Sequence, residues 1–156
     1  MTAMLLVLDN TVLSNFALVE QTALLAQVSP GQMVTARESW QELQTGIELG
    51  LIPRRNYSWL SVLELTAAER TQRDEMMPPL DIGEAACLAL AHARGYALLT
   101  DDRLARREAR RLGVLLSGTI GALISLMDDG HLTLHAANQI LQQMIGVGYR
   151  SPLQSL

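Results

Sequence analysis

The feature that most constrains the fold is an alternation of short apolar runs with amphipathic segments along the whole chain. Apolar runs at 4–9, 33–35, 96–100 and 113–118 predict buried strands, while 57–65 is ambiguous. Helices are predicted over 11–27, 36–50, 66–77, 81–95, 103–111, 119–130 and 134–146. Strands and helices that alternate over short connections predict a parallel sheet covered on both faces. We therefore expect an α/β fold, a three-layer α/β/α sandwich, in a single domain over residues 1–156.

Acidic residues follow two of these predicted strands directly. Asp9 ends the first apolar run, and Asp101 and Asp102 follow the run 96–100. In open parallel sheets, ligands bind beyond the carboxyl ends of the strands, and carboxylates gathered there suit Mg²⁺ or Mn²⁺. Each aspartate also fits a second reading, as the N-cap of the helix that follows it. Both members of the adjacent pair cannot cap one helix, so one of them needs another role.

Three glutamates are further candidates for such an acidic site. Glu84 lies three residues after Asp81, ahead of an apolar run, so it fits a capping box as well as a site. Glu38 and Glu42 lie one helical turn apart on the predicted helix 36–50, where paired glutamates are usually solvated. Local sequence does not choose between Glu38 and Glu42.

The segment after Asp102 is rich in arginine. Five arginines and one glutamate occupy residues 103–111, a local charge of +4 in a chain whose net charge is −4. These side chains fit an exposed helix face, and they fit equally well a surface that binds the phosphates of a nucleic acid. The candidates for binding a nucleic acid are Arg103, Arg106, Arg107 and Arg110.

Composition and missing motifs exclude several other classes. The chain is 49% hydrophobic and 18% charged, as in ordinary globular proteins, and no apolar run has the roughly 18 residues of a membrane helix. Its one cysteine, Cys87, lies in an apolar helix and is expected to pack in the core, and the three histidines have no convincing zinc spacing. Phosphate-binding, dinucleotide and serine-hydrolase motifs are missing. A soluble cytoplasmic protein is expected.

Taken together, these segments resemble PIN-domain proteins, specifically VapC-like toxin ribonucleases of a subgroup with G-E-A and T-D-D motifs. The resemblance begins in "LLVLDNTVLSNFA" and "VTARESWQELQTG", and its most specific part is "DIGEAACLALAHARGYALLTDDRLARREARRLGVLLSGTIGAL". The tail "GVGYRSPL" also matches. The resemblance therefore covers nearly the whole chain.

The resemblance implies Mg²⁺- or Mn²⁺-dependent hydrolysis of RNA, a toxin role opposed by an antitoxin protein, and a homodimer. It makes the first to fourth catalytic acids Asp9, Glu42, Glu84 and Asp102, with Asp101 as a neighbouring metal ligand and Thr100 and Thr11 in support. Thr11 departs from the Asn or Ser common at its position. The segment before Glu42 lacks a proline that many members carry, so Glu38 remains a rival second acid.

Two alternatives to a ribonuclease stay open, and the second has less support. The first is a catalytically silent module of the same fold that acts by binding a protein partner, although such a module would usually have lost some of the four acids. The second is a phosphotransfer domain, which also places an aspartate after its first strand. That reading lacks support, because the chain has D-N-T in place of D-x-D and contains no lysine.

Overall fold

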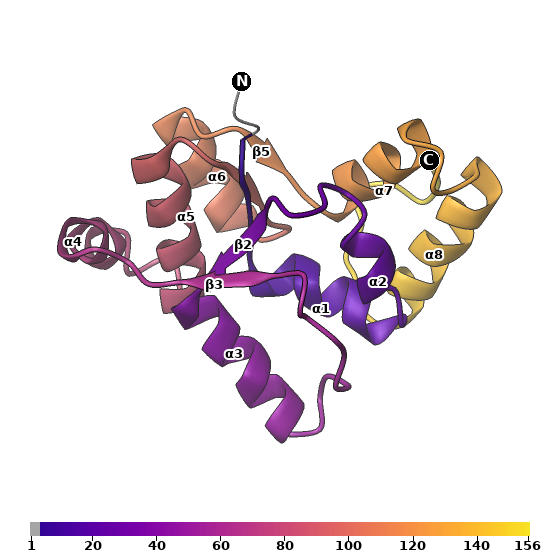
Figure 1. The fold of residues 1–156 in the computed structure, drawn as a ribbon, viewed down its shortest axis with the longest axis horizontal. Helices are drawn as coiled ribbons and strands as arrows, with labels where there is room; N and C mark the ends of the chain where they lie inside the picture. Colours follow the sequence, from indigo (N-terminus) through magenta and orange to yellow (C-terminus); the bar gives the residue numbers. More distant parts are fainter. Residues whose placement is uncertain (1–3) are drawn as a thin grey trace.

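The computed structural model describes residues 4–156 and contains a five-stranded parallel sheet (Figure 1). The strands lie in the order β3-β2-β1-β4-β5, and each neighbouring pair is parallel. Their bounds are β1 Leu6–Leu8, β2 Met33–Ala36, β3 Ser61–Leu63, β4 Ala97–Leu99 and β5 Leu116–Ser117. The strand order reverses between β1 and β4, which is the point where parallel α/β folds form their sites.

Helices cover both faces of the sheet, so the predicted α/β/α sandwich is confirmed (Figure 1). Buried side chains of α1, α3, α7 and α8 form one core, and those of α5 and α6 form most of the other. On β1, Val7 faces the second core while Leu8 faces the first, as strand alternation requires. The helices are α1 Asn10–Leu18, α2 Thr22–Leu25, α3 Arg37–Glu48, α4 Ala67–Glu75, α5 Ile82–Arg94, α6 Arg103–Leu112, α7 Thr119–Asp128 and α8 Leu134–Gly146.

The prediction of one helix over 11–27 is wrong, because the chain breaks between α1 and α2. Glu20 has a φ of 62°, a left-handed conformation that ends the first helix. The amide of Gln21 then donates to the carbonyl of Phe16 at 2.9 Å. Leu25 on α2 still reaches the core with no exposed surface. The apolar spacing continues through the break, so periodicity alone could not reveal it.

The ambiguous segment 57–65 contains β3, a short strand at the edge of the sheet. The predicted helix 36–50 is confirmed with slightly narrower bounds, and Gly50 follows its end with a φ of 75°. Among residues 4–156, no helix is both long enough and apolar enough to cross a membrane.

The carboxyl edge of the sheet is held together beyond the strands themselves. The amide of Asp9 donates to the carbonyl of Leu99 at 3.1 Å, and the amide of Thr100 donates to Ser117 at 3.1 Å. These bonds extend the ladder by one residue past β1 and β4. They fix the first residues after each strand, which include the candidate acids, on rigid backbone.

Candidate functional site

Asp9 is buried at the end of β1, with 2% of its surface exposed. One carboxylate oxygen accepts the amide of Thr11 at 2.9 Å and the Thr11 hydroxyl, and the other accepts the hydroxyl of Thr100. Asp9 is thus the N-cap of α1, which confirms the capping role that its position in the sequence allowed. It also lies at the carboxyl edge of the sheet. Burial raises the pKa of Asp9 to about 7 against the lowering effect of the two hydroxyls, and the charge of Asp101 adds to the rise.

The adjacent aspartates have different partners. Asp102 is the N-cap of α6, where one of its carboxylate oxygens accepts the amide of Ala105 at 2.8 Å. Asp101 bridges to other elements, because it accepts the amide of Thr119 at 2.9 Å, the Thr119 hydroxyl and the side-chain amide of Asn15 at 2.8 Å. Asp101 therefore ties α1 and the start of α7 to the edge of the sheet. These contacts give it a positioning role and leave Asp102 the freer carboxylate.

Glu84 forms the predicted capping box at the start of α5. Its amide donates to Asp81 at 2.8 Å, and its carboxylate accepts the amide of Asp81 at 3.2 Å. Burial raises the pKa of Glu84 to about 8, while the Asp81 amide opposes the rise. The negative charges of Asp81, Asp102 and Asp9 raise it further. Glu84 therefore shares an electrostatic environment with acids from two other segments.

The structure separates Glu42 from Glu38. Glu42 accepts the backbone amide of Gly83 at 3.0 Å, and burial together with the nearby charge of Asp81 raises its pKa. Glu38 instead bonds to Arg73 on α4 at 3.1 Å. Glu42 therefore lies against the start of α5, because its partner Gly83 is the residue before Glu84. The charge of Glu38 is instead neutralised by Arg73.

Gly83 explains how Glu42 comes so close. A side chain at this position would place its Cβ 2.5 Å from one Glu42 carboxylate oxygen and 2.6 Å from the other. The first residue of the G-E-A motif is thus a space requirement, since only glycine leaves room for the carboxylate beside the helix amide.

The acids fit a hard divalent cation in chemical type, because carboxylate oxygens are the ligands that Mg²⁺ and Mn²⁺ prefer. Burial is the main cause of the raised pKa values of Asp9 and Glu84. The charge of Asp101 adds to the rise at Asp9, and the charges of Asp81, Asp102 and Asp9 add to the rise at Glu84. Within residues 4–156, no three acid, imidazole or thiol side chains form a finished metal site. The edge is therefore a set of acids oriented by hydroxyls and amides.

The arginines of α6 divide into different environments. One nitrogen of Arg106 donates to the carbonyls of Thr100 at 2.8 Å and Ser117 at 3.0 Å, so Arg106 clamps the ends of β4 and β5. The sequence predicts that Arg106 binds a nucleic acid, and it does not reveal this structural role. Arg103, Arg107 and Arg110 are exposed. Arg111 pairs with Glu108 on the same helix.

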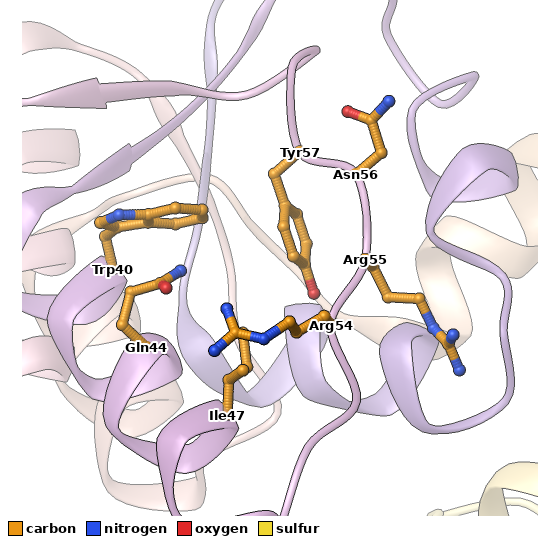
Figure 2. Close-up of a pocket in the computed structure, with 7 residues that line it drawn as sticks. All are labelled: Trp40, Gln44, Ile47, Arg54, Arg55, Asn56 and Tyr57. Carbon is orange, nitrogen blue, oxygen red and sulfur yellow. The ribbon is translucent and has the colours of Figure 1, made fainter.

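A separate cavity of about 420 Å³ lies between α3 and the loop before β3 (Figure 2). Trp40 and Tyr57 meet edge to face across it, with ring centroids 5.4 Å apart. The Tyr57 hydroxyl is buried without a hydrogen-bond partner among the described residues, and burial raises its pKa to about 12. Trp40 and Gln44 share a helix face that Glu42, midway between them in sequence, does not occupy. The cavity is thus separate from the acidic edge.

Sequence reasoning missed the residues that hold Asp101 in place. Asn15 lies in the middle of α1, and Thr119 begins α7, more than a hundred residues later. The G-T pair in "SGTIG" was the available signal, because a Cβ at Gly118 would come 2.5 Å from an Asp101 carboxylate oxygen. Cys87, as expected, is buried in the core, and burial raises its pKa to about 12.

The raised pKa of Asp9 predicts that stability depends on pH. Because the pKa is about 7 when folded and near 3.8 when unfolded, the folded state holds an extra proton between these values. The free energy of unfolding measured in EDTA should therefore fall as pH rises from 4 to 8. Asp9→Asn removes the contribution of Asp9 and leaves that of Glu84, whose pKa is also raised. The variant should therefore become more stable than the wild type as pH rises, by on the order of 2 to 4 kcal/mol at pH 8. Urea unfolding of both proteins from pH 4 to 8 tests this prediction. If their free energies of unfolding change with pH in parallel, the prediction is wrong.

The comparisons with known proteins agree with this geometry. A family model described as a PIN domain matches residues 5–155. No sequence among curated proteins matches the chain. PIN domains are generally nucleases, which makes this a nuclease-type fold whose substrate class is RNA or another nucleic acid. With the match spanning almost the entire chain and the parallel sheet in place, the chain belongs to the PIN-domain family.

Proposed function

We propose that the chain, as a single domain, is a metal-dependent endoribonuclease. Asp9, Glu84 and Asp102 would hold Mg²⁺ or Mn²⁺, with Glu42 as the remaining acid of the set. One observation carries the proposal: at the carboxyl edge of the sheet, the charges of Asp9 and Asp102, which come from two other segments, both raise the pKa of the Glu84 carboxyl. Asp101 supports the set through α1 and α7 and is the less available ligand.

The protein's own groups would orient these carboxylates before any substrate arrives. Hydroxyls of Thr11 and Thr100 fix the carboxylate of Asp9, and the amide of Gly83 fixes that of Glu42. When bound, the cation supplies a water of lowered pKa and neutralises charge on the phosphodiester. Exposed arginines of α6 would hold the RNA backbone without reading its sequence.

The direct test is cleavage of single-stranded RNA by the purified protein with Mn²⁺, Mg²⁺ or EDTA. Asp9→Asn and Glu84→Gln should each lower the rate at least about a hundredfold while the fold survives, because each removes a charged ligand. Glu42→Gln should also lower the rate strongly. Glu38→Gln is the matched control and should have little effect, since Glu38 is paired with Arg73. Cleavage that persists in EDTA or in Asp9→Asn contradicts the proposal.

A glycine substitution tests the placement of Glu42 without touching an acid. Gly83→Ala should displace the Glu42 carboxylate and lower cleavage about as far as Glu42→Gln does. Alanine favours a helix, so thermal stability should change by less than about 1 kcal/mol. Gly146→Ala on α8 is the control, because an added Cβ there meets nothing within 4 Å. Wild-type activity in Gly83→Ala would remove Glu42 from the catalytic set.

We further propose that this nuclease is the cytoplasmic toxin of a toxin–antitoxin pair and acts as a homodimer whose antitoxin covers the acidic edge. The support is the likeness of the chain to such toxins and the cluster of acids at that edge, none of which pairs with an arginine in the described part of the chain. Induced expression of the wild type should arrest growth of a bacterial host, whereas Asp9→Asn at equal abundance should not. Growth that is equally unaffected by both proteins argues against a toxin.

The alternative is a catalytically silent module that binds a protein partner. It would be favoured if the protein cleaved no tested RNA and calorimetry detected no uptake of Mn²⁺. Retention of all four acids, Asp9, Glu42, Glu84 and Asp102, at one edge of the sheet favours the enzyme.

A further inference from the structure

A cavity of about 610 Å³ opens beside the acidic edge, between α6, the start of α7 and the C-terminal tail. We call it the arginine pocket and define it by the basic side chains Arg103, Arg106, Arg110 and Arg150 and by Tyr149, Ile120 and Ile124, all of which line it. The amide of Tyr149 donates to the carbonyl of Met144 at 3.0 Å, which turns the tail back after α8. Residues far apart in the sequence therefore share one wall.

The positive charge of the pocket is not neutralised from within. Among residues 4–156, Arg103, Arg110 and Arg150 make no ion pair and no side-chain hydrogen bond. Asp101 also lines the pocket and offsets one of its four positive charges, so the lining keeps a net positive charge. The oxygens of Asp101 accept hydrogen bonds from Thr119 and Asn15, and no arginine among the described residues pairs with it. Three guanidinium groups around one cavity can bind an anion, and phosphate suits their planar donors.

The remainder of the wall is apolar and aromatic. Ile120 and Ile124 project from the first turns of α7, and Ile124 is 42% exposed. Tyr149 is half-buried, and its pKa is raised to about 12 by burial and by the charge of Asp101, so its ring stays neutral at physiological pH. A flat apolar group stacks well on such a ring. The pocket thus offers two complementary surfaces, one for a phosphate and one for a base.

The pocket connects directly to the catalytic candidates. The amide of Asp101 donates to the Thr11 hydroxyl at 2.9 Å, and that hydroxyl bonds to Asp9. A strand held in the pocket would therefore continue past Asp101 toward the acids. An acidic peptide would use the arginines but would leave the ring and the isoleucines uncovered, so a nucleic acid fits the whole pocket better.

We propose that the arginine pocket is a nucleotide subsite for single-stranded RNA, next to the bond that the acids cleave. Tyr149 stacks on a base, while Arg103, Arg110 and Arg150 bind the phosphates on either side. The placement next to a cleaved bond rests on the proposed nuclease function. The binding itself does not depend on that function, so the two can be tested separately.

The test measures binding of a fluorescein-labelled, mixed-sequence 12-nucleotide RNA by anisotropy, in EDTA and over a series of salt concentrations. Arg110→Gln should weaken binding about fivefold and reduce the slope of log affinity against log salt by about 0.7, as the loss of one phosphate contact does. Tyr149→Ala should weaken binding about tenfold with an unchanged slope, whereas Tyr149→Phe should bind like the wild type. Arg111→Gln, on the same helix and outside the pocket, should stay within twofold.

The outcomes separate the subsite from the enzyme. Wild-type affinity in both Arg110→Gln and Tyr149→Ala overturns the subsite, even if the protein cleaves RNA with Mn²⁺. Weakened binding in both variants supports the subsite, even if the wild type cleaves nothing and the nuclease proposal fails. If a polyglutamate peptide displaces the RNA and Tyr149→Ala leaves both affinities unchanged, the pocket binds an acidic protein segment and the proposal is wrong.

Discussion

The hydrogen bonds that hold the buried Asp9 carboxylate organise the whole acidic edge. Asp9 accepts hydroxyls from Thr11, at the start of α1, and from Thr100, at the end of β4. The Thr11 hydroxyl also accepts a hydrogen bond from the amide of Asp101. The carboxylate of Asp9 and the two threonines therefore connect the ends of β1 and β4 to Asp101. Burial of this carboxylate disfavours its charge, and the hydroxyls offset only part of that cost. The edge therefore holds several acids on backbone that is fixed by the ladder bonds past β1 and β4.

The acids of the candidate site are also helix caps or lie next to a helix start. Asp9 and Asp102 cap helices, Glu84 closes a capping box, and Asp101 bonds to the first residue of α7. A helix start in this fold faces the carboxyl edge of the sheet, so a cap also lies at the site. Reading these acids as caps or as site residues was therefore never a choice between exclusive alternatives.

The parallel sheet and its family were predictable because the chain alternates short apolar strands with helices and places acids directly after two of the strands. Three features were not. Glu20 ends α1 in a left-handed conformation that apolar spacing does not reveal. Glu38 and Glu42 look alike in sequence. Only the tertiary arrangement, with α5 packed against α3 and α4 packed against α5, brings Arg73 to the first and Gly83 to the second. Arg106 looked like one of a basic row, yet it spans two strand ends.

The sequence by itself determined four of the five strands, most of the helix starts and the acids that follow the strands, because these depend on local periodicity and capping. It also determined the family, through motifs spread over nearly the whole chain. Only the tertiary structure decided that Glu42 accepts the amide of Gly83 and that Arg106 donates to two backbone carbonyls, whereas Arg103 and Arg110 remain unpaired among the described residues. It alone brought Tyr149 and Arg150 beside α6. Those outcomes depend on contacts between segments distant in the chain, and local patterns carry no information about such contacts.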